Sequence, residues 1–145
     1  MYKASDIARY IIERCKETNR QISNLKLQKI LYFVQAEFLV AKNEPCFEEP
    51  IEAWDFGPVV PSVYYEYRMF GGAEIPRIGS SNVKGIISPS DRKILNGIID
   101  ACSEYSASAL VEITHNQTPW KMAHEFGSYN SVITPESIKD YFKKD

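Results

Sequence analysis

The sequence predicts a mainly α fold: a compact bundle of about seven helices around a buried central helix (residues ~24–42), with a minor two-stranded β element. Three observations predict it. Apolar residues recur at helical spacing along most of the chain, three Ser/Thr-Pro pairs stand where helices would begin, and glycines mostly separate the periodic stretches. The 145 residues suit a single domain, 1–145, that buries roughly two-thirds of its unfolded surface.

The first two predicted helices differ in how much of their surface is apolar. The first begins at the N-cap candidate Ser5, ends near Asn19 and carries one apolar stripe. Ser23 can cap the second, whose apolar residues from Leu25 to Val40 cover most of its circumference. A helix that is apolar nearly all round belongs inside a fold, so the other helices should pack against this one.

A strand-like alternation at residues 51–54 precedes the pair Gly57-Pro58. Proline excludes the preceding residue from the right-handed helical region, so this pair forces a turn that orients Trp54. Pro61 suits the first turn of a third helix, which ends at Gly71-Gly72.

Residues 73–87 have the composition of a long loop or a weak hairpin. At the end of this stretch, Ile86-Ile87 is the candidate to pair with residues 51–53 and form the small sheet.

Later helix starts share one chemistry. The pairs Ser88-Pro89, Thr118-Pro119 and Thr134-Pro135 each place a hydroxyl cap before a proline that is preset for the first helical turn. Ser106 is the cap candidate of one more short helix. These starts bring the predicted number of helices to about seven.

Composition excludes several classes of protein. The three cysteines have no C-x-x-C spacing, which argues against a disulfide framework and a zinc site. No apolar run is long enough to cross a bilayer, and the first residues lack the core of a secretory signal, so we expect a cytoplasmic protein without membrane contact. A net charge of −2 makes nucleic acid an unlikely partner.

No catalytic motif is present in the sequence. The two histidines, His115 and His124, lack zinc-protease spacing, and no nucleophile elbow, P-loop or dinucleotide fingerprint occurs. His115 follows a predicted helix, where an imidazole can bond the free carbonyl groups, and a hydrolase built on it is the weaker alternative. We therefore predict no enzyme activity, no cofactor and no metal.

An acidic, aromatic segment is the main functional candidate. Between Asn43 and Tyr67 there is no lysine or arginine, and the segment could receive a basic protein partner. Its candidate binding residues are Glu48, Glu49, Glu52, Trp54, Asp55 and Tyr64. The alternative is a buried Trp54 beneath a solvated acidic loop.

A polar row on the central helix is a second candidate. Gln28, Tyr32 and Gln35 share one helical row, with Lys26 and Lys29 beside it. The row could line a binding groove or make internal hydrogen bonds. A helix-turn-helix at residues ~7–40, which would place Lys26 and Lys29 near the start of a reading helix, is the nucleic-acid alternative.

Three groups of residues together resemble the Panacea antitoxin domain family, which includes SocA-like antitoxins and phage-associated proteins of the GepA type. The groups are Lys26 to Tyr32, then Ile51 to Val59 with Pro61 and Tyr64, and finally Thr114-His115 with Pro119-Trp120. The chain departs from the family pattern at Phe56, where tyrosine is frequent, and at Ala36, where glycine is frequent.

The resemblance implies a helical antitoxin that neutralises a toxin encoded beside it, by direct binding or as an adaptor to a Clp-type protease. For such an antitoxin, the residues themselves suggest that the acidic segment binds the partner, together with Lys26, Gln28 and Tyr32 of the polar row. Structural roles fall to the motif residues Gly57, Pro58, Pro61, His115, Pro119 and Trp120. A homodimer is left open, and the alternative function is a phage or prophage transcriptional regulator.

Overall fold

The computed structural model describes residues 1–79 and 81–143, which form eight α-helices, one 3-10 turn and three short strands. The predicted mainly helical fold is confirmed. In chain order the elements are α1 (Ala4–Glu17), α2 (Asn24–Lys42), β1 (Ile51–Trp54), β2 (Gly57–Val59), α3 (Pro61–Tyr67), η1 (Arg68–Phe70), α4 (Val83–Ile86), α5 (Pro89–Cys102), α6 (Ala107–His115), α7 (Thr118–Phe126), β3 (Val132–Ile133) and α8 (Pro135–Phe142).

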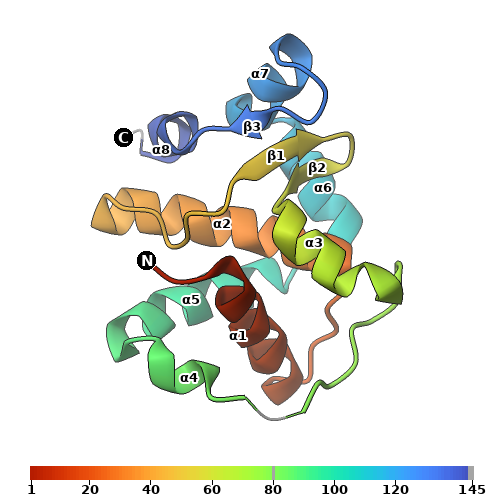
Figure 1. Cartoon of the computed structure of the whole chain (residues 1–145), viewed down its shortest axis with the longest axis vertical. Helices are drawn as coiled ribbons and strands as arrows, with labels where there is room; N and C mark the ends of the chain where they lie inside the picture. The colour runs from red at the N-terminus through yellow and green to blue at the C-terminus, as the bar shows by residue number, and fades with distance from the viewer. Residues whose placement is uncertain (80, 144–145) are drawn as a thin grey trace.

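The helix α2 is the centre of the fold, as its apolar circumference predicts. In Figure 1 it crosses the middle of the molecule, with α1, α4 and α5 on one side and the sheet, α6, α7 and α8 on the other. It packs against α1, α3, α5, α6, α8 and β2. Large side chains such as Leu27, Leu31 and Phe38 are therefore almost completely buried.

Four predicted hydroxyl caps are present. The side chains of Ser23, Ser88, Ser106 and Thr134 each accept a hydrogen bond from a backbone N–H in the first turn of the following helix. Thr118 differs, because it lies inside α7 and the N-cap position belongs to Gln117.

The predicted cap of the first helix is wrong. Ser5 lies within α1, and the N-cap residue Lys3 makes no side-chain hydrogen bond to the helix. Instead Glu49, far away in sequence, accepts a hydrogen bond from the backbone N–H of Ala4 at 3.1 Å. A carboxylate suits this place because the N-terminus of a helix carries a partial positive charge.

The small sheet has three antiparallel strands in the order β2-β1-β3. Trp54 pairs with Gly57, which makes a tight hairpin between β1 and β2, and Ile51 pairs with Ile133 on the other edge of β1. The predicted pairing of Ile86-Ile87 with this strand is wrong. Both edges of β1 are already occupied, Ile86 ends the short helix α4, and Ile87 is buried in the core.

Two further observations concern membrane-spanning helices and the cysteine thiols. Within residues 1–79 and 81–143, no helix combines the length and the apolar character needed to span a bilayer. The three cysteines are unpaired and buried, and this burial raises the pKa of each thiol.

Candidate functional site

The hairpin of β1 and β2 and the helix α3 together present an aromatic cluster at the surface. Trp54 and Phe56 come from the hairpin, and Tyr64 and Tyr65 come from α3. The ring centroid of Trp54 lies 5.0 Å from that of Tyr64 and 5.8 Å from that of Phe56, both in edge-to-face geometry. Trp54 is half-buried, whereas Tyr65 is 55% exposed. The cluster is therefore anchored by packing at one end and open to solvent at the other.

Strand alternation determines which side chains of β1 face outward. Ile51 and Ala53 are buried, and Glu52 and Trp54 are partly exposed on the opposite face. The indole Nε1 of Trp54 donates a hydrogen bond to Glu52 Oε1 at 2.8 Å. The pair places a carboxylate beside the aromatic cluster.

The acidic side chains of this region are not neutralised by lysine or arginine. In the part of the chain that the structure describes, Glu48, Glu49 and Glu52 form no ion pair. Glu48 is exposed, and Glu49 is used at the start of α1. Among the described residues, the carboxylate of Asp55 is paired with His124, with Oδ1 lying 2.9 Å from Nε2, and the Asp55 side chain is 87% exposed. Within the described part of the chain, the carboxylates around the hairpin therefore have no lysine or arginine partner.

A stack of three rings holds the hairpin from behind. The indole of Trp120 lies between the imidazoles of His115 and His124, with centroid distances of 4.1 and 4.3 Å. Trp120 Nε1 donates to the carbonyl oxygen of Trp54 at 2.8 Å, and His115 Nε2 lies 2.9 Å from the carbonyl oxygen of Asp55. His115 thus bonds the hairpin rather than the end of its own helix, which corrects the sequence-based expectation.

Two prolines among the motif residues position neighbouring helices. Pro119 is buried in the first turn of α7, the helix that carries Trp120. Pro61 begins α3, the helix that carries Tyr64 and Tyr65. A proline at the start of a helix loses no internal hydrogen bond and has the φ angle that the helix needs.

The polar row on α2 lies inside the protein. Gln28 and Tyr32 are 0% exposed and Gln35 is 3% exposed. Gln28 Oε1 accepts from the backbone N–H of Val60, and the hydroxyl of Tyr32 donates to the Gln117 side chain. The structure therefore corresponds to the internal hydrogen-bonding alternative, and the row offers no exposed groove to a partner in this conformation.

The burial of α2 also argues against the helix-turn-helix alternative. Lys29 is 0% exposed, and the half-buried Lys26 directs its Nζ toward the carbonyl oxygen of Ser103 at 3.4 Å. A reading helix must present its first turns to the bases. Neither lysine is displayed in that way.

Lys29 has a role that the sequence reasoning missed. Its Nζ donates to the carbonyl oxygen of Pro58 at 2.9 Å, and within the described residues it faces no carboxylate. Burial lowers the pKa of Lys29 to about 7. One feature of the sequence could have predicted this burial. Lys29 stands on a helix that is apolar on almost every side, so its side chain has no solvent-facing side of the helix to occupy.

Gly57 and Lys29 are packed so closely that each limits the other. Gly57 has a φ of +111°, and a Cβ atom at this position would lie 2.6 Å from Lys29 Cε. The left-handed conformation and the close approach both require glycine. Gly57, Pro58 and Lys29 therefore form one unit beneath the aromatic cluster.

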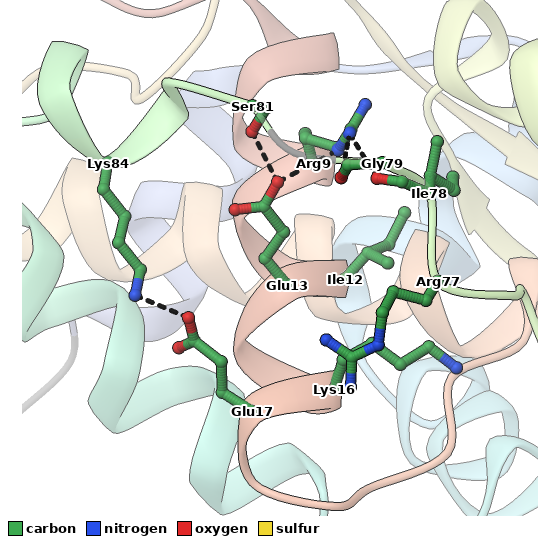
Figure 2. A pocket seen from close by; sticks show the side chains of 10 residues that line it. All are labelled: Arg9, Ile12, Glu13, Lys16, Glu17, Arg77, Ile78, Gly79, Ser81 and Lys84. Atoms are coloured by element: carbon green, nitrogen blue, oxygen red, sulfur yellow. Dashed lines mark hydrogen bonds and ion pairs between the residues drawn. The ribbon is translucent and has the colours of Figure 1, made fainter.

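A cavity of about 580 Å³ lies elsewhere, between α1 and the segment that leads into α4. Figure 2 shows that most of its charged side chains already have partners: Arg9 contacts Glu13 and two backbone carbonyls, and Lys84 contacts Glu17. These contacts attach the segment to α1, so the charges hold the fold together. Within the described residues, no group of three or more potential metal-ligating side chains occurs.

Comparison with known proteins gives two matches. The family model described as "Antitoxin SocA-like, Panacea domain" matches residues 27–121, a range that includes most of α2, the hairpin and Trp120. The protein named antitoxin SocA, from Caulobacter vibrioides (strain NA1000 / CB15N), is 36% identical over an aligned length of 156 residues. The alignment covers 97% of this chain and 82% of that protein. No solved structure matches.

Proposed function

This chain belongs to the SocA-like antitoxin family with a Panacea domain, as its motifs predict, and on that premise we propose that it neutralises a toxin by binding it through the hairpin surface. We also propose that the whole chain acts as one domain, since α2 packs against helices from both ends of the sequence. We therefore propose a protein-binding module that acts without catalysis.

The docking face that we propose consists of outward side chains on and next to the hairpin. Its members are Glu48, Glu49, Glu52, Trp54, Asp55, Tyr64 and, added from its exposure, Tyr65. Aromatic residues are enriched among the side chains that contribute most to protein binding. Carboxylates without internal cationic partners favour a basic partner and increase the rate at which it associates.

The single observation that carries the proposal is this combination of charge and rings at one place. Glu52 bonds the indole of Trp54, and the same indole packs on Tyr64. A partner that covers the rings would also meet the carboxylate. Its own lysine or arginine would then find a carboxylate that forms no ion pair with the described residues of this chain.

Buried motif residues act on this face from inside the protein. Gln28 holds the backbone of Val60 at the end of the hairpin, and Lys29 holds Pro58. Lys26, near the start of α2, contacts Ser103 after α5. Tyr32, further along α2, contacts Gln117 before α7. We assign these residues to positioning the docking face rather than to touching the toxin.

Two routes of neutralisation begin with the same contact. The antitoxin can block the toxin by occupying its surface, or it can deliver the toxin to a Clp-type protease in the cytoplasm. Measuring the half-life of the toxin in cells with and without the protease separates the routes. Shortening of the half-life only when both the antitoxin and the protease are present identifies delivery.

Co-expression tests the proposal. The gene beside this one is expressed alone and with this chain, and growth and co-purification are scored. We expect the chain to restore growth and to co-purify with the toxin. In the variant Glu52→Lys/Tyr65→Ala, binding should weaken roughly tenfold or more.

A matched variant controls for nonspecific effects. Glu112→Lys/Tyr105→Ala makes the same two chemical changes at exposed positions on α6 and after α5. It should keep full rescue. Thermal melts of both variants test whether unfolding, rather than a lost contact, causes any loss of toxin binding. If the variant at the docking face rescues and co-purifies as well as the control, the proposed face is wrong.

A further inference from the structure

We propose that the groove between the segment 45–51 and β3 receives an apolar side chain of the toxin that is flanked by lysine or arginine. This inference rests on the proposed function, because it names the toxin as the source of the inserted segment. The groove has a volume of about 310 Å³. Its lining residues are Met1, Gln35, Pro45, Phe47, Glu48, Glu49, Pro50, Ile51, Val132, Ile133, Pro135 and Ile138.

The floor of the groove is apolar. Phe47, Ile51, Ile133 and Ile138 are each exposed by 3% or less. The one uncharged polar side chain in the lining, Gln35, accepts hydrogen bonds from two backbone N–H groups and donates to the carbonyl oxygen of Phe47. Among the described lining residues, the floor therefore has no buried polar side chain without a partner, so an inserted aliphatic or aromatic side chain would gain from burial.

The walls favour a side chain over an added strand. Three of the lining residues, Pro45, Pro50 and Pro135, have no backbone N–H. Strand addition depends on a continuous row of backbone donors and acceptors. Since these walls lack donors at three places, recognition depends on the side chain that enters the groove.

The rim determines the charge of the partner. Glu48 and Glu49 line the groove, and no lysine or arginine does. Glu48 is exposed and makes no hydrogen bond or ion pair with the described residues. One oxygen of Glu49 accepts from Ala4, which leaves the other available. The α-amino group of Met1 forms no ion pair with either carboxylate, so a cation beside the inserted side chain would supply the missing partner.

The groove continues the docking face. Val132, which is 48% exposed, pairs with Glu52 across the sheet and also lines the groove. A single toxin segment can therefore cover Trp54 and Glu52 and place its next apolar residue into the groove. This continuity makes the toxin a better occupant than an unrelated ligand.

A short peptide tests the groove without the toxin. The probe is a capped peptide in which one leucine stands between two lysines, and the matched probe replaces both lysines by glutamate. Amide chemical shifts of the labelled protein report where each peptide binds. We expect the lysine peptide to change the amide chemical shifts of residues around the groove, such as Ile51 and Ile133. The glutamate peptide should bind at least about fivefold more weakly.

Two variants locate the contact. Glu48→Lys should weaken binding of the lysine peptide about fivefold or more. Glu44→Lys makes an equal charge change at an exposed residue outside the groove lining and should weaken this binding less. Val132→Trp should block the groove while leaving the fold intact, because this side chain is exposed. Equal binding of the two peptides, or shifts confined to another surface, overturns the proposal.

The same variants separate this inference from the proposed function. If the wild-type chain neutralises the toxin and both Glu48→Lys and Val132→Trp do so equally well, the groove proposal fails while the antitoxin function stands. If the lysine peptide binds in the groove but no toxin co-purifies, the proposed function fails instead. Sedimentation tests another occupant: a dimer that Val132→Trp dissociates would assign the groove to a second copy of the chain and overturn the proposal.

Discussion

Lys29 donates a hydrogen bond from inside the protein to the carbonyl oxygen of Pro58, with Nζ and O 2.9 Å apart. The ammonium group also lies 5.6 Å from the ring centroid of Phe56. One buried side chain on α2 is therefore connected both to the backbone of the hairpin and to a member of the aromatic cluster. Changes to this unit should alter the shape of the docking face without touching its exposed atoms.

Replacing Gly57 by alanine should destabilise the protein by about 2–4 kcal/mol. The new Cβ would combine a strained φ of +111° with an approach of 2.6 Å to Lys29 Cε. Chemical denaturation measures the loss. Gly72→Ala is the control, since apart from its two chain neighbours no described residue has an atom within 4 Å of its Cβ position, and it should change stability by less than about 0.5 kcal/mol. Similar losses for the two variants would refute the close packing of Gly57 and Lys29.

The stability of the protein should depend on pH through Lys29. Burial lowers the pKa of its amine to about 7 in the folded protein, whereas the unfolded chain has a value of about 10.4. Between these values the unfolded state binds more protons, so the contribution of Lys29 to stability rises with pH, by up to about 1.4 kcal/mol per pH unit. Below pH 7 the penalty for burying the charge is complete.

The variant Lys29→Met isolates this effect from other titrating groups. The free energy of unfolding of the wild type minus that of the variant should increase as the pH rises from about 7 to 10. Denaturation at a series of pH values measures both. Parallel pH profiles for the two proteins would mean that the amine is not buried as the structure has it.

Glu49 should stabilise the start of α1, unlike its neighbour Glu48. Glu49→Ala removes the acceptor of the Ala4 N–H and should cost about 1 kcal/mol. Glu48→Ala removes an exposed carboxylate without a partner among the described residues and should stay within about 0.5 kcal/mol. Thermal melts compare the two, and a larger loss for Glu48→Ala would exclude the cap.

Trp120→Phe should loosen the hairpin while keeping an aromatic ring between the two imidazoles. The change removes the Nε1–H that bonds the carbonyl oxygen of Trp54, which should cost about 1 kcal/mol. Amide hydrogen exchange of the hairpin should become faster. Unchanged exchange in β1 and β2 would show that the ring stack, and not this hydrogen bond, holds the hairpin.

Some features of the fold could be predicted because they depend on residues close together in the sequence. The circumference of α2 follows from apolar spacing, and the caps at Ser23, Ser88 and Ser106 bond N–H groups three residues later. The turn at Gly57-Pro58 follows from the steric restriction by proline. The acidic character of the docking face follows from the absence of lysine and arginine between Asn43 and Tyr67.

Other features depend on partners that local patterns do not identify. The N–H of Ala4 meets a carboxylate 45 residues later, and Ile51 pairs with Ile133. A strand of two residues, as in β3, is too short for its alternation to be recognised. The same limit applies to His115, which by its position should bond its own helix but bonds the hairpin instead.

By itself, the sequence determined the helical class, the central helix, the proline-restricted turn and the family, since spacing, caps and motifs act over a few residues. Only the tertiary structure decided which polar groups are buried and which remain exposed. Gln28 and Lys29 turn inward because α2 is covered on nearly every side, whereas Glu48 and Glu52 stay outward without cationic partners in the described chain. The physical reason is that burial depends on contacts between distant segments, and these exist only once the chain has folded.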